Sequence, residues 1–265
     1  MPVQLQSLLS GSSGNAVMIS DQSTRLLIDC GVRAQYRCHD LLDRIAAEGP
    51  PLSGVIVSHL HTDHINYSSL RAIEERGIPV YVHRDNLDML PRYHFKKRSF
   101  DVLDLHAYSD EPFRLGALEI RPIEVPHSNW HTTHSFVVSS KGNHSGRRIV
   151  VATDFYEWTH AVEKFVDADL FYLEANHDPE MLRRRPNPNS AFHLENSHAA
   201  ALLCEILDRS RKPPKAVMLA HLSEERNTPE IALQTVRSVV EREGLDLPPL
   251  MVAPRNVPSE VVRLE

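Results

Sequence analysis

The stretch VIVSHLHTDHINY, residues 55 to 67, places three histidines and one aspartate within six positions, directly after an apolar run. These residues are His59, His61, Asp63 and His64. Three imidazoles beside a carboxylate would repel one another when protonated and would be costly to bury without partners. Zinc-like ions bind imidazole nitrogen and carboxylate oxygen, and catalytic sites leave one position for water. The HxHxDH spacing therefore predicts a metal site.

The metal-site motif follows a predicted buried strand. Residues 53–59 (SGVIVSH) form an apolar run that is too short for a helix and contains β-branched side chains. A helix is expected over residues 67–76, so the motif would lie in a loop at the carboxyl end of a strand, where open α/β sheets favour ligand sites. The first two histidines would point to one side and share an ion, while the following Asp-His pair would face a neighbouring ion.

Apolar periodicity predicts an alternation of strands and helices along the rest of the chain. Further strands are expected at 3–9, 15–20, 24–30, 79–83, 118–126, 134–140, 147–154, 169–176, 215–221 and 249–254, and further helices at 36–47, 158–166, 196–210 and 229–243. No Gly/Ser-rich, Pro-rich or charged linker interrupts the alternation. These features favour one α/β domain over residues 1–265.

Several predicted strands end in a histidine or an aspartate, which packing alone does not explain. His127, Asp154 and His221 each follow an apolar strand pattern and would raise the number of metal donors to seven. Two ions need more ligands than the four of the HxHxDH loop. A lone strand-end histidine such as His83 is far more often a surface or hydrogen-bonded residue than a ligand.

Charge and cysteine content limit the partners and the compartment. The net charge is −6, so a polyanionic substrate would need a local basic patch. The three cysteines are an odd number without a CxxC pair, which favours reduced thiols in a cytoplasmic protein. No apolar run approaches 20 residues and the N-terminus lacks a signal-peptide pattern, so no membrane span is expected.

The HxHxDH motif followed by a later histidine, an aspartate and a final histidine resembles the signature of the metallo-β-lactamase fold superfamily. The resemblance implies an α/β fold, the metallo-β-lactamase-like αββα sandwich, with two divalent ions, zinc or manganese. It implies a first ion held by His59, His61 and His127, a second held by Asp63, His64 and His221, and Asp154 bridging them. Asp29 in LLIDCG matches the strand-end aspartate that supports the metal loop by a hydrogen bond, although it could also simply open a turn.

Longer segments resemble the YycJ/WalJ-type subgroup, bacterial metal-dependent hydrolases regarded as 5′-to-3′ DNA exonucleases. The matching segments are LSGSSGNAVMI, LLIDCG, LEANHDPEML, HLEN and LAHLSEERNTPEIA, from Ser7 to about Ala232. The chain departs from the subgroup at Glu195, where the usual GHLSN pattern has a serine. An acidic side chain fits poorly beside a phosphate, which puts the substrate in doubt.

Other residues are predicted to bind the substrate. Ser12 and Ser13 lie in SGSSG, whose backbone could form an anion nest or a plain turn. His193, just before a predicted helix, is the candidate proton donor. The remaining candidates are His177 and Asn196 from the subgroup motifs and the basic run Arg183, Arg184 and Arg185. A second basic stretch, PRYHFKKR at 91–98, interleaves cations with aromatic rings, although such runs usually form solvated surfaces.

Metal-assisted phosphodiester hydrolysis of DNA is the leading hypothesis, with Asp63 orienting the nucleophile and His193 protonating the leaving oxygen. Hydrolysis of a small ester, a thioester or a cyclic phosphodiester is an alternative, in which the basic runs would be idle surface. A non-catalytic metal-binding or nucleic-acid-binding scaffold is a third, although a binding module has no need of seven donors.

Overall fold

Two mixed β-sheets form the centre of the computed structural model, which describes the chain except for residues 1, 96–98, 101, 129 and 141–145. The first sheet has the order β14-β1-β2-β3-β4-β5-β6 and the second the order β13-β12-β11-β10-β9-β8-β7. The first sheet comprises β1 (Val3–Leu9), β2 (Ala16–Ser20), β3 (Arg25–Ile28), β4 (Gly54–Ile56), β5 (Val80–His83), β6 (Leu105–Tyr108) and β14 (Val262–Leu264). The second comprises β7 (Phe113–Leu115), β8 (Leu118–Val125), β9 (Thr133–Ser140), β10 (Arg148–Ala152), β11 (Leu170–Glu174), β12 (Ala216–Ala220) and β13 (Leu250–Val252).

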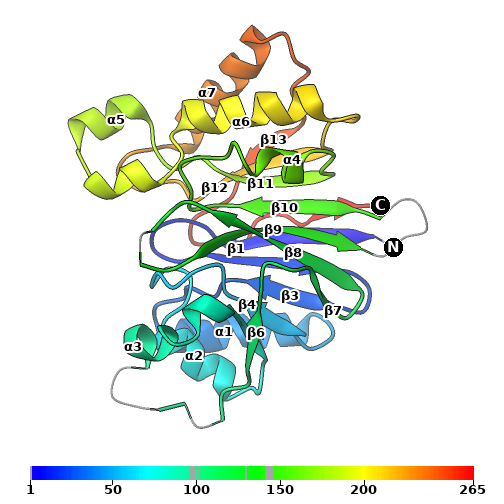
Figure 1. Cartoon of the computed structure of the whole chain (residues 1–265), viewed down its shortest axis with the longest axis vertical. Coiled ribbons are helices and arrows are strands. Elements are labelled where there is room, and N and C mark those ends of the chain that lie inside the picture. The colour runs from blue at the N-terminus through cyan, green and yellow to red at the C-terminus, as the bar shows by residue number, and fades with distance from the viewer. Residues whose placement is uncertain (1, 96–98, 101, 129, 141–145) are drawn as a thin grey trace.

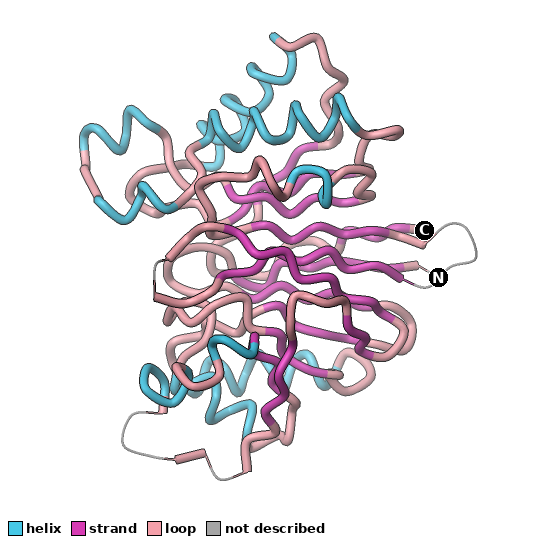
Figure 2. Tube along the Cα trace, viewed as in Figure 1, coloured by secondary structure: helices cyan, strands magenta, loops and turns pink. Residues whose placement is uncertain are grey.

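Helices cover the outer face of each sheet, so the chain forms four layers (Figures 1 and 2). The helices beside the first sheet are α1 (Gln35–Ala47), α2 (Tyr67–Glu74) and α3 (Leu90–His94), preceded by the 3₁₀ turn η1 (Arg84–Asn86). Those beside the second are α4 (Val162–Phe165), α5 (Pro179–Arg184), α6 (Asn196–Arg209) and α7 (Pro229–Arg242), with the 3₁₀ turn η2 (Pro188–Phe192) between α5 and α6. The predicted αββα sandwich is confirmed.

Three apolar cores hold the layers together. The middle core joins the inner faces of the two sheets through side chains such as Ile19, Phe136 and Tyr172, and the other two lie under the helices on each side. Strands β3 to β6 run parallel, as do β10 to β13. Parallel strands deliver their carboxyl ends to one edge, so the loops that follow them can combine into one site.

Most predicted elements are confirmed, but three strands, β6, β7 and β14, were not foreseen. Each has only three or four residues, and the middle two residues of β6 are exposed. Such short strands carry little apolar periodicity. The helix predicted over 158–166 forms only at α4, and part of the basic stretch 91–98 lies outside the described residues. In the described part of the chain, no helix has the length and apolarity needed to cross a bilayer.

Three predicted site residues follow a strand in a left-handed backbone conformation. The φ angles are 63° for Asp29, 63° for Asp154 and 54° for His221. Residues with a Cβ adopt this region rarely and at a cost, so the strand ends are held there by their surroundings. The turn ends each strand abruptly, which is why β10 stops at Ala152 rather than at the predicted residue 154.

The loops after β1 and β3 pack directly against the HxHxDH loop. The Cys30 amide donates to the His64 carbonyl at 2.8 Å, and the Asn15 amide donates to the Asp63 carbonyl at 2.8 Å. A Cβ placed on Gly31 would lie 1.7 Å from the Asp63 carbonyl oxygen. A side chain at this position would therefore displace the backbone that carries two predicted ligands.

Gly31→Ala is expected to lower the free energy of unfolding by about 3 kcal/mol, because backbone must move to admit the methyl group. Gly77→Ala is the control: nothing lies within 4 Å of the added carbon, although the φ of Gly77, 58°, is itself unfavourable for alanine. That variant should cost only about 1 kcal/mol, from the left-handed backbone. Denaturant unfolding of both measures the difference. Equal losses would show that the close approach at Gly31 is unimportant.

Candidate metal centre

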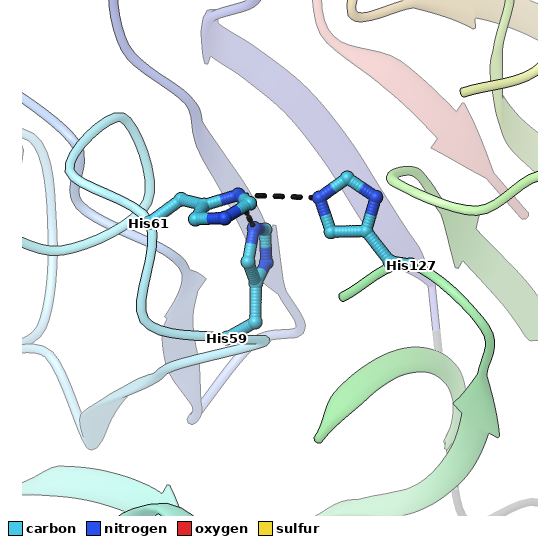
Figure 3. Close-up of side chains that lie close together, drawn as sticks. All are labelled: His59, His61 and His127. Atoms are coloured by element: carbon cyan, nitrogen blue, oxygen red, sulfur yellow. Dashed lines mark hydrogen bonds between the residues drawn. The ribbon is translucent and has the colours of Figure 1, made fainter. Parts of the chain in front are cut away.

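Three histidines meet at the first half of the site (Figure 3). His59 Nε2 lies 3.0 Å from His61 Nδ1, and His127 Nε2 lies 3.2 Å from the same nitrogen. Two ligands bound about 2.1 Å from one tetrahedral ion stand about 3.4 Å apart. His59 and His61 come from the loop after β4, whereas His127 follows β8 of the other sheet. The three nitrogens are thus spaced like the ligands of one ion.

The imidazoles of this cluster bind protons weakly. Burial lowers the pKa of His59, His61 and His127, and for His61 the neighbouring histidines help to bring it to about 4. Burial and His61 also lower the pKa of the adjacent His131 to about 3. Neutral imidazoles carry the lone pairs that a metal ion binds. The cluster is therefore in its metal-binding form at neutral pH.

Two carboxylates and two histidines form the second half. His64 Nε2 lies 3.3 Å from Asp154 Oδ2 and 3.7 Å from Asp63 Oδ2. His221 Nε2 lies 3.5 Å from Asp63 Oδ2, and Asp154 Oδ1 lies 3.7 Å from His127 Nε2 of the first half. The Asp154 carboxylate therefore lies between the two groups, a position consistent with the bridging role that the family resemblance implied.

Asp154 provides the test of whether these residues suit metal ions. Its side chain is buried, and among the described residues neither carboxylate oxygen has a hydrogen-bond partner. A buried carboxylate without hydrogen bonds is costly unless opposite charge lies close by. Ligand atoms of His59, His64 and Asp154 all lie within 4.8 Å of one another, as do those of Asp63, His64 and His221. The donor set therefore fits divalent ions.

Asp29 supports the HxHxDH loop from behind. Its carboxylate accepts hydrogen bonds from the Ser58 amide and hydroxyl, each at 2.8 Å, and lies 2.7 Å from His64 Nδ1. Burial opposes a charge on His64, but Asp154, Asp29 and Asp63 outweigh it and raise its pKa to about 9. The contact to Nδ1 leaves Nε2 facing the other donors, which is how outer carboxylates orient ligand histidines.

Glu174, at the end of β11, was missed as a site residue. It is fully buried, and its Oε1 lies 2.8 Å from both His193 Nδ1 and His221 Nδ1. Burial opposes its charge, but His193 and His221 outweigh it and lower the pKa of the Glu174 carboxyl to about 2. The sequence did carry a signal, because Glu174 ends an apolar strand as Asp154 nearly does. It lies in the LEANHD motif, in which His177 was the residue predicted to bind substrate.

A pocket of about 690 Å³ opens over these donors. The sequence-predicted residues on its wall include Ser12, Asp63 and His193. It is also lined by residues that the sequence did not single out, namely Trp130, Asn187, Asn189, Phe192 and Arg226. The site thus combines the donor cluster with aromatic, amide and cationic groups.

The other predicted substrate residues lie off the pocket wall. Ser13 lines a separate groove beside α1, and His177 and Asn196 are buried, with Asn196 and Asn227 exchanging amide hydrogen bonds. The carboxylate of Glu195 accepts from the Ser197 hydroxyl. Asp178 caps α5 through the Met181 amide, as the sequence indicated. The three predicted arginines are exposed at the end of α5, where Arg183 and Arg184 pair with Glu180.

Comparisons with known proteins find relatives over most of the chain. A family model described as the beta-lactamase superfamily domain matches residues 24–221. The chain is 25% identical over 258 residues to a Bacillus anthracis protein named exodeoxyribonuclease YycJ, with 92% of this chain and 91% of that protein covered. It is 26% identical to exodeoxyribonuclease WalJ of Streptococcus pneumoniae, with 86% and 85% covered.

Among solved structures, the metallo-β-lactamase fold protein YhfI of Bacillus subtilis superposes with a TM-score of 0.73 at 18% identity, over 99% of both chains. The family match covers most of the chain, and the observed fold agrees with it. This chain therefore belongs to the metallo-β-lactamase fold superfamily of hydrolases, whose fold implies divalent metal ions, and its described residues include His/Asp groups that could bind such ions.

Proposed function

We propose that the chain is a dinuclear metal-dependent phosphodiesterase that degrades DNA in the manner of a 5′-to-3′ exonuclease. The observation that carries the dinuclear assignment is the buried Asp154 carboxylate, which lacks hydrogen bonds among the described residues and lies between two donor groups. The assignment to DNA draws support from the two relatives named exodeoxyribonucleases. We also propose a cytoplasmic location, in keeping with the free cysteines Cys30, Cys38 and Cys204.

The proposed ligands divide between the two halves of the site. His59, His61 and His127 would hold one ion, Asp63, His64 and His221 would hold the other, and Asp154 would contact both. When bound, zinc or manganese ions would supply charge neutralisation for the phosphate and lower the pKa of a water molecule. The remaining tasks fall to side chains of this chain.

His193 is placed to deliver a proton to the leaving oxygen. It lines the pocket, and its Nδ1 contacts Glu174 at 2.8 Å, which leaves Nε2 for the substrate. Glu174 fixes the imidazole and also holds His221, so the proton donor and a proposed ligand share one support. The Asp63 side chain is 17% exposed and lines the pocket. From there it can orient the attacking water as well as bind an ion.

The mouth of the pocket suits a nucleotide chain. The Trp130 and Tyr93 side chains are exposed, and their ring centroids lie 4.5 Å apart beside the donors. Exposed aromatic faces can stack on bases, and Arg226, Asn187 and Asn189 supply groups for phosphates or sugars. The α5 arginines lie beyond these groups, and the Arg226 guanidinium donates to the Arg185 carbonyl at 2.7 Å. A polynucleotide could extend from the pocket along this surface.

Asp154→Asn is expected to lower tightly bound metal by one equivalent or more, from about two in the wild-type centre, because the neutral amide is a weaker bridging ligand. Metal analysis of gel-filtered protein measures the loss. Asp167→Asn is the matched control, since Asp167 also has a left-handed backbone with φ 60° and pairs with Arg211 outside the site. Full metal retention in Asp154→Asn would remove the bridging assignment.

His193→Gln is expected to reduce DNA cleavage by about 10²-fold or more, because the alkoxide leaving group needs a proton. Cleavage of an aryl phosphodiester should change little, since a phenolate leaves without one. His198→Gln provides the control, because that histidine is exposed on α6, which begins three residues after His193. The same loss on both substrates would mean that His193 has another task, such as holding the ligands.

Charge reversal at Arg183, Arg184 and Arg185 together is expected to weaken single-stranded DNA binding and flatten its salt dependence. Each lost phosphate contact lowers the slope of log K against log salt by about 0.7. Fluorescence anisotropy at several salt concentrations measures both quantities, and turnover of an aryl phosphodiester should stay close to that of the wild type.

The control for the arginine variant reverses three other exposed arginines, Arg237, Arg242 and Arg263, which changes the net charge equally. If both triple variants lose the same affinity, the effect comes from the overall charge and not from the α5 surface. If neither loses affinity, the nuclease proposal fails while a dinuclear hydrolase of small substrates remains.

A further inference from the structure

A second cluster of ligand-type side chains lies outside the proposed dinuclear centre. His83 ends β5, Asp110 follows β6, and His134 is the second residue of β9 in the other sheet. One ligand atom from each of the three lies within 4.8 Å of the others. The cluster thus spans the two sheets, and none of its members belongs to the donor set described above.

The distances are long for hydrogen bonds and also suit co-ligands of one ion: of the two histidines, His134 makes a long hydrogen bond to Asp110. His83 Nε2 and His134 Nε2 each lie 3.4 Å from the same atom, Asp110 Oδ1. A charged imidazole would approach a carboxylate to about 2.8 Å. Two ligands held about 2.1 Å from one tetrahedral ion stand about 3.4 Å apart, which matches both distances. The three atoms therefore surround a position that an ion could fill.

Burial points the same way. The His83 and His134 side chains are 1% and 0% exposed, and His83 Nε2 has no hydrogen-bond partner among the described residues. Burial and the neighbouring His83 lower the pKa of His134 to about 4, so its imidazole is neutral and one ring nitrogen carries a lone pair. The two ring centroids are 4.3 Å apart. Such close buried imidazoles would not both accept a proton.

The two carboxylate oxygens of Asp110 have different neighbours: the histidines lie near Oδ1, and one side of the cluster is open to solvent. The Arg84 guanidinium lies near the other oxygen, Oδ2, at 3.7 Å, and the Asp110 side chain is 56% exposed. His83 Nδ1 accepts a hydrogen bond from the Asp85 amide at 3.4 Å and lies 3.3 Å from the Thr132 hydroxyl. Binding of a cation at Nε2 would move the ring proton to Nδ1, which would then give up the long bond to the amide and donate to Thr132, the usual outer contact of a ligand histidine.

We propose that His83, Asp110 and His134 bind a further divalent cation of the zinc type, with its open coordination position toward solvent. Two imidazole nitrogens and one carboxylate oxygen suit zinc rather than magnesium or calcium, which prefer oxygen ligands. The ion would connect β5 and β6 of the first sheet to β9 of the second. It would also steady the HxHxDH loop, because the His134 amide donates to the Ser58 carbonyl at 3.2 Å.

Metal analysis of Asp110→Asn tests the proposal, because this exposed residue can be changed with little risk to folding. Wild type and variant are stripped with a chelator, refilled with zinc ions, freed of loose metal by gel filtration and analysed. The variant should hold about one zinc fewer than the wild type, and zinc should raise its Tm less. In an Asp154→Asn background, adding Asp110→Asn should again remove about one further zinc, whatever the dinuclear centre retains.

His106→Gln is the matched control, since His106 Nε2 also lies 2.9 Å from an aspartate, Asp104, but both side chains are about half exposed. Its zinc content should equal that of the wild type. Unchanged zinc content and melting in Asp110→Asn would overturn the proposal. An equal loss in His106→Gln would also overturn it, because the zinc would then be bound adventitiously by surface histidines.

Discussion

The structure of the site depends on burying the negative charge of Asp154. This carboxylate has no hydrogen bonds within the described residues, so its stability rests on nearby positive charge alone. Four histidines surround it, and its pKa is held far below the ordinary range although burial opposes the charge. The imidazoles can supply that positive charge only by binding protons or by holding cations. The rest of the site, including the supporting acids and the strained strand ends, keeps those histidines in place.

Support for the histidines comes from acids that never reach the pocket centre. Asp29 holds His64, and Glu174 holds both His193 and His221. Each acid is buried and sits at or just after the end of a strand, where the sheet fixes its backbone. Rigid supports of this kind restrict which imidazole nitrogen faces the centre. The geometry is consequently set by the sheets rather than by the loops alone.

Much of the fold and of the candidate site could be predicted from the sequence, because apolar runs ending in His or Asp are local patterns. The long helices followed from periodicity, and the αββα sandwich followed from the resemblance to a known family. The short edge strands such as β6 and β14 did not, since three or four residues contain too little pattern.

The seven proposed ligands are brought together, although the sequence alone could not show that His177 and Asn196 would be buried away from the pocket. Burial of that kind depends on tertiary packing. The positions of Arg226 and Trp130 on the pocket wall could not be predicted for the same reason, because nothing in their local sequence distinguishes them. His83 shows the limit most clearly, because the sequence does not reveal that His134 on β9 and Asp110 after β6 lie beside this strand-end histidine.

The donors of the second half lie far apart along the chain: Asp63 and His221, 3.5 Å apart in space, are separated by 158 residues. Closing so long a loop carries an entropic cost that must be met before the contact can form, so we expect this half of the centre to be assembled late in folding. The HxHxDH loop by itself is short enough to capture an ion while the two sheets are still apart. An ion held there would be a partial, weaker complex that becomes complete only when the sheets dock, so metal uptake and sheet docking favour each other thermodynamically.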